Sequence, residues 1–282
     1  MRRTIGWWGA VLLAGCGGGG QALPPDVTCP GAAYLLNPAN GPGPGVGDVA
    51  PSLGTACSDG RFVISSNGLP PWSYQPKAAD ELVPVAHTWT LPRVPKVAAQ
   101  PTPLPRFGAV GISVTGLPIY GPNDGPEPVS EAYGDPLYNL RVDDCLGHSS
   151  AEGYHLHALD ERCHSSEGLV AEPWRLVPRD PSLPSPVIGF ALDGFPIYGP
   201  SECVDAACSA TRLMKSGYVQ KAGQRPRTEA ALAFEWHAHP DDPASLDECN
   251  GHASDDANFP YHYHSTEGWP YVAGCLRGTP VP

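Results

Sequence analysis

The sequence predicts an all-β protein of mostly short strands and long loops, with a single domain built from two duplicated halves and stapled by disulfides. Glycine (33) and proline (35) are abundant in the 282 residues and follow no short period, which favours turns over helices. A helical period is found only between Thr228 and Trp236. With 41% hydrophobic and 16% charged residues, the chain can bury a sizeable core.

The N-terminus has the features of an export signal. Two arginines precede an apolar run from Ile5 to Ala14, and a small pair of residues stands immediately before Cys16. About ten apolar residues are too few to cross a bilayer. We therefore expect a lipoprotein signal over residues 1–16, with Cys16 as the lipidated residue. Gly17 in place of an aspartate favours an outer-membrane or cell-surface location, with the N-terminal lipid as the only membrane contact.

Composition changes after the signal. Residues 17–58 are rich in Gly, Pro, Ala and Asn, which predicts a flexible linker, and we expect the folded domain over 59–282. The formal net charge of −12 repels nucleic acid and anionic lipid heads but tolerates cations. A nucleic-acid partner is thus not indicated, and no feature identifies a protein partner.

Two segments of the chain match each other closely. VGISVTGLPIYGPND (110–124) aligns with IGFALDGFPIYGPSE (188–202). In each, an apolar strand reaches a two-residue turn, Thr115-Gly116 or Asp193-Gly194, and a second strand ends in Ile-Tyr-Gly-Pro, which predicts two β-hairpins. We interpret Asp193 as a turn residue only. The repeats are expected over about 107–165 and 186–276, with an insertion in the second.

A histidine cassette follows each hairpin. Both cassettes contain an acidic pair, a cysteine, a Gly-His turn, a Tyr-His-x-His strand and a second cysteine. The first has Asp143, Asp144, Cys145, His148, His155, His157 and Cys163; the second has Asp247, Glu248, Cys249, His252, His262, His264 and Cys275. Histidines two residues apart on a strand point to one face. With the turn histidine, they form a three-nitrogen set of the kind that transition metals bind.

These six histidines are the predicted ligands of copper or zinc, at one shared site or at two. Three protein nitrogens leave a coordination position open, as in catalytic zinc sites, while copper(II) would outcompete zinc for the same donors. Alternatively, the histidines are structural and form hydrogen bonds with the nearby carboxylates. His237 and His239 repeat the spacing within the insertion and are possible additional ligands, whereas His87 and His164 are expected at the surface.

The acidic pairs are the candidate catalytic residues: Asp143, Asp144, Asp247 and Glu248. Each could orient a histidine ring, ligate the metal, or act as general base for a bound water. The alternative interpretation is that they are solvated turn residues. Tyr261 and Tyr263 lie on the face opposite the strand histidines, where they either belong to the core or line a pocket. Tyr120 and Tyr198 are open to the same two interpretations.

Eight cysteines remain besides Cys16, an even number that predicts disulfides in an exported protein. Counting alone leaves their connectivity open. The repeat suggests that Cys145 pairs with Cys163 and Cys249 with Cys275, and neighbouring positions then suggest Cys29 with Cys57 and Cys203 with Cys208. Thiolate metal sites are disfavoured because no C-x2-C pair is present.

From Arg61 to Gly278 the chain resembles the bacterial YHYH proteins. The resemblance is carried by Ser66-Asn67-Gly68-Leu69-Pro70, by Gly116-Leu117-Pro118-Ile119-Tyr120, by the D-x-C-x-G-H turns and by Tyr261-His262-Tyr263-His264. In the first cassette Leu156 replaces the second tyrosine. The resemblance implies no particular activity. Our expectation is a surface-anchored metal-binding protein; the alternatives are a metal-dependent hydrolase or oxidase with an extracellular substrate, and a structural or adhesive module without metal.

Overall fold

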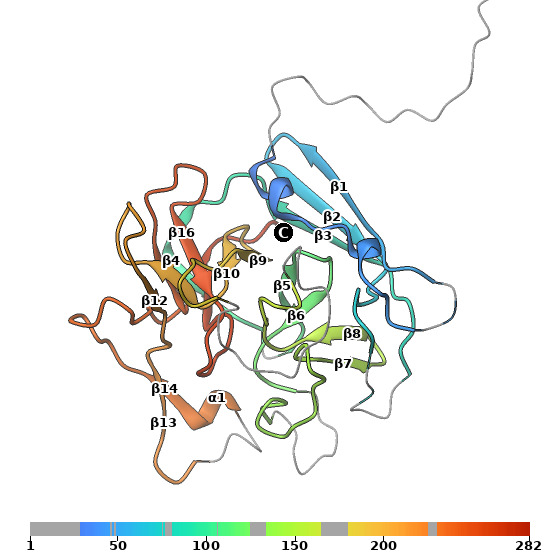
Figure 1. The fold of residues 1–282 in the computed structure, drawn as a ribbon. Coiled ribbons are helices and arrows are strands. Elements are labelled where there is room, and N and C mark those ends of the chain that lie inside the picture. Colours follow the sequence, from blue (N-terminus) through green and yellow to red (C-terminus); the bar gives the residue numbers. More distant parts are fainter. Residues whose placement is uncertain are drawn as a thin grey trace, which may run out of the picture.

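The computed structural model describes residues 29–45, 47, 49–74, 76, 81–105, 107–124, 134–164, 180–224 and 230–282. Short strands and loops dominate this part of the chain, which confirms the all-β prediction (Figure 1). The helical pieces are η1 (Pro30–Tyr34), η2 (Pro38–Asn40) and α1 (Ala230–Ala233). The signal segment 1–16 and Cys16 lie outside the described residues. Within those residues, no helix is long and apolar enough to cross a membrane.

An eight-stranded sheet forms the centre of the molecule, in the order β15-β16-β10-β9-β5-β6-β8-β7 (Figure 1). Its strands are β5 (Ala109–Ser113), β6 (Pro118–Tyr120), β7 (Gly147–Ser150), β8 (Gly153–Leu156), β9 (Val187–Ala191), β10 (Pro196–Tyr198), β15 (Gly251–Ala253) and β16 (Tyr261–His264). Both edges show the same order, first a cassette pair and then a hairpin. The halves meet where β5 runs antiparallel to β9, with Ile112 opposite Phe190.

Within each half, the cassette strand lies parallel to the second strand of the hairpin. Ile119 of β6 pairs with Leu156 of β8, and Ile197 of β10 pairs with Tyr263 of β16. These equivalent pairings place the two histidine cassettes toward opposite edges of one sheet. The two aligned segments therefore occupy equivalent positions in the sheet.

The hairpin turns explain the glycine at the end of each two-residue turn. Gly116 has φ +89° and Gly194 has φ +86°. In this left-handed region of backbone conformation, a residue with a side chain has a higher conformational energy than glycine. A Cβ on Gly194 would also stand 2.7 Å from the carbonyl oxygen of Pro92. The backbone conformation therefore requires the glycine in each of the two turns.

Smaller sheets surround the central one. They are formed by β1 (Leu53–Ser58), β2 (Arg61–Ser66) and β3 (His87–Pro92); by β4 (Val97–Pro103) with β17 (Cys275–Gly278); by β11 (Ser201–Cys203) with β12 (Thr211–Leu213); and by β13 (Tyr218–Gln220) with β14 (Phe234–Trp236). The strand β14 occupies the end of the segment that has helical periodicity in the sequence. Of the described residues 230–236, those of the short α1 are helical.

The predicted linker over 17–58 overlaps ordered secondary structure in its described residues. The elements η1, η2 and β1 lie between Cys29 and Ser58, and β1 pairs with β2 along its whole length. Tyr34, Leu35 and Leu36 pack, partly buried, against a cluster that includes Phe62 and Phe190. Their partial burial stabilises this part of the chain against the domain despite its glycines and prolines. Residues 17–28 lie outside the described part.

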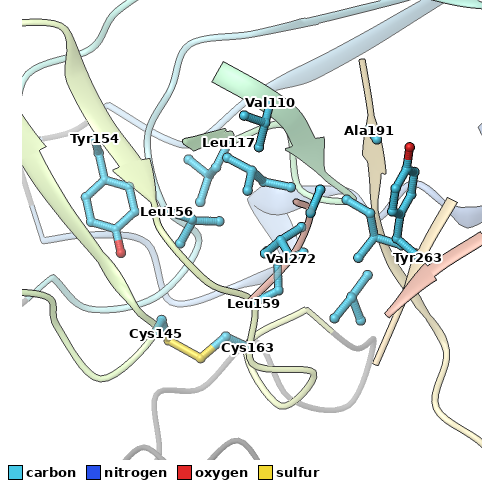
Figure 2. Close-up of a cluster of buried hydrophobic side chains, with 14 of the residues drawn as sticks. Val110, Leu117, Cys145, Tyr154, Leu156, Leu159, Cys163, Ala191, Tyr263 and Val272 are labelled. Carbon is cyan, nitrogen blue, oxygen red and sulfur yellow. A yellow bond between two sulfur atoms is a disulfide. The ribbon is translucent and has the colours of Figure 1, made fainter. Parts of the chain in front are cut away.

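The main core lies on one face of the central sheet and draws residues from both halves (Figure 2). Tyr154 and Leu156 of β8, and Tyr261 and Tyr263 of β16, belong to it. Side chains alternate along a strand, so the intervening histidines point to the opposite face. The first of the two interpretations of Tyr261 and Tyr263, core residues, is thus the one that the structure shows.

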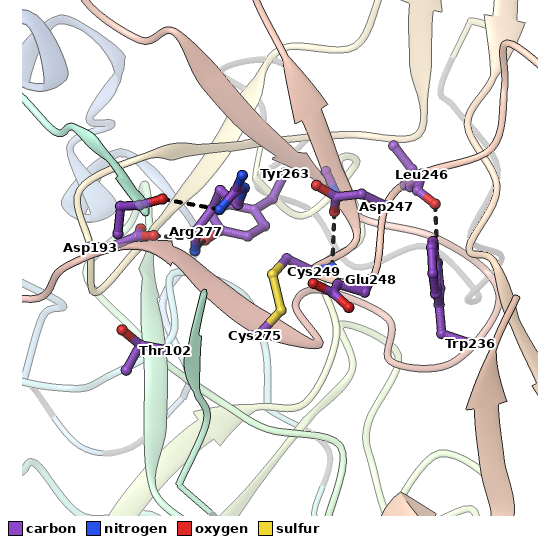
Figure 3. The surroundings of a disulfide bond; sticks show 12 residues. Thr102, Asp193, Trp236, Leu246, Asp247, Glu248, Cys249, Tyr263, Cys275 and Arg277 are labelled. Carbon is purple, nitrogen blue, oxygen red and sulfur yellow. Dashed lines mark hydrogen bonds between the residues drawn. A yellow bond between two sulfur atoms is a disulfide. The ribbon is translucent and has the colours of Figure 1, made fainter. Parts of the chain in front are cut away.

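Four disulfides are present, and they join the cysteines that the sequence suggested. They are Cys29–Cys57, Cys145–Cys163, Cys203–Cys208 and Cys249–Cys275. Cys249–Cys275 ties the Gly-His turn of the second cassette to β17 (Figure 3), and Cys145–Cys163 joins the equivalent turn of the first cassette to the segment beyond β8. Each cassette is therefore closed by its own disulfide.

Candidate metal centres

The six cassette histidines form two separate clusters, which we name centre 1 and centre 2. Centre 1 comprises His148, His155 and His157; centre 2 comprises His252, His262, His264 and Glu202. In each group, one potential ligand atom from every residue lies within 4.8 Å of the others. A site shared by both cassettes, one of the two expected arrangements, is therefore not what the structure contains.

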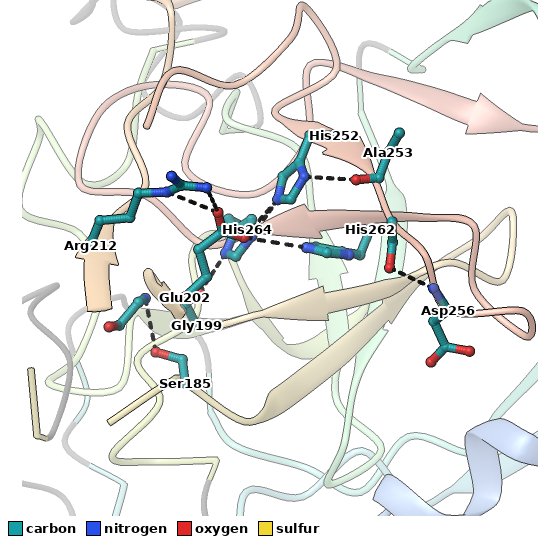
Figure 4. A network of polar contacts seen from close by, with 11 residues as sticks. Ser185, Gly199, Glu202, Arg212, His252, Ala253, Asp256, His262 and His264 are labelled. Carbon is teal, nitrogen blue, oxygen red and sulfur yellow. Dashed lines mark hydrogen bonds and ion pairs between the residues drawn. The ribbon is translucent and has the colours of Figure 1, made fainter. Parts of the chain in front are cut away.

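In centre 2, strand pairing brings the histidines together. His252 of β15 lies directly opposite His262 of β16, and His264 follows two residues later on the same face. The Nε2 atoms of His252 and His264 are 3.2 Å apart (Figure 4). The Gly-His turn and the Tyr-His-Tyr-His strand are thus two strands of one antiparallel pair.

Glu202 completes centre 2 from β11. Its Oε2 lies 2.9 Å from Nε2 of His252, 3.5 Å from that of His264 and 3.9 Å from that of His262. Its other oxygen, Oε1, accepts hydrogen bonds from Nε and Nη2 of Arg212, at 3.1 and 2.6 Å. Glu202 and Arg212 face each other across the β11–β12 pair. Oε1 of the carboxylate is therefore hydrogen-bonded to Arg212, and Oε2 faces the histidines (Figure 4).

Centre 1 follows the same plan. His148 of β7 lies opposite His155 of β8, and His157 follows just beyond the strand. The Nε2 atoms of His148 and His157 are 3.1 Å apart. All three side chains are buried.

A carboxylate and an arginine accompany centre 1 as well. Asp124 places Oδ1 3.7 Å from Nε2 of His148 and Oδ2 3.4 Å from Nε of Arg141. Asp124 and Glu202 are the last residues of the two aligned segments, each four positions after the tyrosine of Ile-Tyr-Gly-Pro. The aligned segments thus mark both carboxylates, although the two residues lie outside the cassettes and differ in type.

The hairpins also orient the last histidine of each cassette. Nδ1 of His157 donates to the carbonyl oxygen of Gly121 at 2.8 Å, and Nδ1 of His264 donates to that of Gly199 at 2.7 Å. A proton fixed on Nδ1 leaves the Nε2 lone pair facing the cluster, which is the arrangement that a metal ligand needs. This explains why the Tyr-Gly-Pro segments accompany the cassettes: each supplies the carbonyl that sets a ring.

Burial keeps the histidines in the form that binds metals. It lowers the pKa of His155 to about 3, helped by the charge of His148. It lowers the pKa of His262 to about 4, although Glu202 acts in the opposite direction. The pKa of His264 is lowered by burial as well. For Glu202, burial would raise the pKa, but the close contacts with the three histidines and with Arg212 outweigh it and hold the pKa well below its usual range. The donors of centre 2 thus include an ionised carboxylate and, at His262 and His264, neutral imidazoles.

Tyrosines of the hairpins stand beside both centres. The ring of Tyr120 stacks on His155 with 4.0 Å between centroids, and its hydroxyl donates to Oε2 of Glu152 at 2.6 Å. In centre 2 the equivalent Tyr198 is tilted by 56° to His262, with 4.9 Å between centroids. These two tyrosines therefore line the clusters, unlike Tyr261 and Tyr263.

The four candidate catalytic carboxylates lie outside both clusters. Oδ1 of Asp143 accepts from the backbone N–H of Cys145 and Gly147, and Oδ2 accepts from the hydroxyl of Tyr154 at 2.7 Å. Burial raises the pKa of Asp143 to about 6 against the effect of these hydrogen bonds. The carboxylate therefore fixes the turn to a core tyrosine, and it does not face the histidines of centre 1.

Asp247 has the same role in the second cassette. It accepts from the backbone N–H of Cys249 (Figure 3), from that of Gly251 and from the hydroxyl of Tyr261. Asp144 and Glu248, the other members of the acidic pairs, are exposed. The carboxylates that do face the histidines are Asp124 and Glu202, which come from the hairpin segments rather than from the cassettes.

The remaining histidines also differ from expectation in part. His237 lies 3.1 Å from a carboxylate oxygen of Glu235 on the exposed insertion and does not join centre 2. His164, expected at the surface, is buried and packs edge-to-face on Trp72. His87 is half-buried.

One central sheet, carrying two clusters that each combine three histidines with a carboxylate and an arginine, defines a β-sheet protein with paired candidate metal centres. The chain belongs to the YHYH protein family, whose model matches residues 88–278, more than half of its length. The match contains both hairpins and both cassettes and confirms the resemblance seen in the motifs. No curated protein and no solved structure matches the chain.

Proposed function

We propose that this protein binds two transition-metal ions, copper or zinc, one in each centre, as an exported lipoprotein anchored through Cys16. The observation that carries the proposal is the convergence of three imidazoles and one ionised carboxylate in centre 2, with the ligand atoms within 4.8 Å of one another. Ligand atoms about 2.0–2.2 Å from a common ion must converge in this way.

The nitrogen atoms of centre 2 need a cation between them. Nδ1 of His252 donates to the carbonyl oxygen of Ala253 at 2.9 Å, and Nδ1 of His264 donates to Gly199. Both Nε2 atoms then carry lone pairs at 3.2 Å from each other, a repulsive contact unless a proton or a metal ion intervenes. Burial of His264 opposes a proton, whereas a metal ion satisfies both nitrogens and Glu202 together.

The donor set restricts the choice of ion. Imidazole and carboxylate suit zinc and copper(II), whereas a thiolate site would select softer ions. The eight described cysteines are all in disulfides, so they supply no thiolate. Disulfides of this number are characteristic of exported proteins, which supports a role in holding metal at the cell envelope.

Metal holding is favoured over catalysis. A metal-dependent hydrolase or oxidase needs an open coordination position. Glu202 adds a fourth protein donor to the three histidines of centre 2, which satisfies a tetrahedral ion. A structural module without metal is disfavoured by the facing Nε2 atoms of His252 and His264. Each ring uses its Nδ1 proton to hydrogen-bond a carbonyl oxygen, so neither neutral ring has a proton on Nε2 to share.

The proposal is tested by metal content. The chain after Cys16 would be secreted into a periplasm, reconstituted with Zn²⁺ or Cu²⁺, freed of excess ion and analysed by plasma mass spectrometry. We expect two ions per chain, and one in the His262→Ala/His264→Ala variant. The His237→Ala/His239→Ala variant is the matched control, since it removes an exposed H-x-H pair and should retain both ions. Wild-type protein without stoichiometric metal would refute the proposal.

A further inference from the structure

We infer that the two centres have different roles: centre 2 exchanges its metal ion with solvent and small chelators, and centre 1 retains its ion. The inference rests on the proposed function and adds that metal ions exchange with solvent mainly at one of the two centres. It is carried by a contrast between two clusters that otherwise share one design.

Exposure of the ligands differs between the centres. In centre 1, His148, His155 and His157 are 3%, 4% and 1% exposed. In centre 2, the side chains of His252, His262 and Glu202 are 30%, 15% and 17% exposed, and only His264 is sealed at 1%. An incoming ligand can therefore reach an ion in centre 2 from the side of His252.

The cover over the edge strand accounts for part of this contrast. Both β7 and β15 are edge strands of the central sheet. Chain from the N-terminal part of the domain lies over β7: the backbone N–H of Ser149 donates to the hydroxyl of Tyr74 at 3.3 Å, and its Oγ donates to the carbonyl oxygen of Glu81 at 3.0 Å. Val85 packs against Gly153 at the start of β8. The edge of the sheet beside centre 1 is thus covered by a segment that precedes both repeats.

The connection between the cassette strands adds a second difference. Only residues 151–152 separate β7 from β8, and Glu152 in this turn anchors the hydroxyl of Tyr120 while the tyrosine ring covers His155. In centre 2, residues 254–260 form a longer connection, and Tyr198 is tilted away from parallel stacking on His262. A tyrosine stacked and tied in place shields the ion in centre 1 from solvent.

Closure sets the rate at which each ion is lost. Removal of a bound ion by a chelator requires that the chelator enter the coordination shell while a protein ligand leaves. In centre 2, the exposed His252 can turn outward without opening the core. In centre 1, the buried ligands must first be uncovered by local opening, which costs free energy and slows the exchange.

The experiment follows release of Zn²⁺ from the reconstituted chain, using the colour change of 4-(2-pyridylazo)resorcinol added in excess. We expect two phases of one ion each, with the slow phase at least about tenfold slower. His262→Ala should abolish the fast phase and leave the slow one. The equivalent variant of centre 1, His155→Ala, should abolish the slow phase.

Tyr120→Phe keeps the stacked ring but removes its anchor to Glu152, and it should accelerate the slow phase alone. Tyr198→Phe is the matched control and should leave the slow phase unchanged. If His155→Ala does not fold, the His262→Ala and Tyr120→Phe results still decide the assignment. Equal release rates for both ions, or loss of the slow phase in His262→Ala, would overturn the inference. Absence of bound metal in the wild type would instead refute the proposed function itself.

Discussion

The hydroxyl of Tyr263 donates a hydrogen bond of 2.7 Å to Oδ2 of Asp193, across 70 positions of the sequence (Figure 3). Asp193 also accepts from the backbone N–H of Gly278 at 2.7 Å, so this residue of the hairpin turn links β16 to β17. In the other half, Leu156 stands in place of the tyrosine and Thr115 in place of the aspartate. The tyrosine and the aspartate are thus both present in one half and both replaced in the other. Replacing only one of them would leave a buried polar group without its hydrogen-bond partner. Asp193 is therefore more than the turn residue predicted from the sequence.

This pair predicts a coupling in stability. Tyr263→Phe and Asp193→Thr should each lower the free energy of unfolding by about 1–3 kcal/mol, since each orphans a buried group. The double variant Tyr263→Phe/Asp193→Thr should cost less than the sum of the two single variants. Urea denaturation of the wild type, the two single variants and the double variant measures the coupling. Additive costs would show that the two side chains do not act as a unit.

Glu202 predicts a specific loss of metal affinity. Glu202→Gln keeps the shape of the side chain but removes the charge that faces three histidines, so affinity at centre 2 should fall about 10–100-fold. Competition titration with a chromophoric chelator measures the change. Glu248→Gln, which alters an exposed carboxylate of the cassette, should have no effect. A larger effect of Glu248→Gln than of Glu202→Gln would contradict the assignment of the carboxylate ligand.

His164 predicts a pH dependence of stability in the metal-free protein. Burial lowers its folded-state pKa to about 4, whereas the unfolded value is 6.5. Both states are neutral above pH 6.5; as pH falls toward 4, only the unfolded state takes up the proton, so stability is lost by up to about 3 kcal/mol. His164→Phe keeps a ring against Trp72 and should flatten this part of the profile. Denaturation midpoints from pH 7.5 to 4.5, compared with those of the wild type, test the difference.

Metal removal should destabilise the fold. An ion that binds only the native state adds about 4 kcal/mol when free metal exceeds its dissociation constant a thousandfold. We therefore expect a clear fall in Tm upon addition of EDTA in excess over Zn²⁺, measured by calorimetry. His262→Ala/His264→Ala should show a smaller fall, because one centre remains. An unchanged Tm in the wild type would favour the structural module over the metal-binding protein.

The sequence was sufficient for features that repeat or alternate. Period-two alternation placed Tyr261 and His262 on opposite faces of one strand, and the Asp-Gly turn located the second hairpin. The two copies of the cassette related His252 to His262 and His264 before any geometry was known. These inferences succeed because strand direction and turn chemistry are local properties of the chain.

The carboxylates that face the histidines are less evident in the sequence, because they lie outside the cassettes and are marked only by the aligned ends of the two hairpin segments. Glu202 reaches centre 2 because β11 follows β10, the strand that pairs with β16. Conversely, Asp247 belongs to the cassette in sequence but accepts hydrogen bonds from backbone N–H groups and from Tyr261. Proximity along the chain therefore does not identify the carboxylates that face the histidines. The packing of Tyr34 within the segment predicted as a linker likewise depends on tertiary contacts that local composition does not reveal.

The disulfides have a consequence for how the chain matures. Cys145–Cys163 lies within the first half, Cys203–Cys208 and Cys249–Cys275 lie within the second, and Cys29–Cys57 lies before both. None of these four covalent links joins one half to the other, so contact between β5 and β9 and the shared core unite them. Oxidation can then proceed segment by segment in the order of emergence from the secretion channel, with docking of the halves as the last step. Mass mapping of disulfides in early refolding samples would show the native pairs before the central sheet is complete, if maturation follows this order.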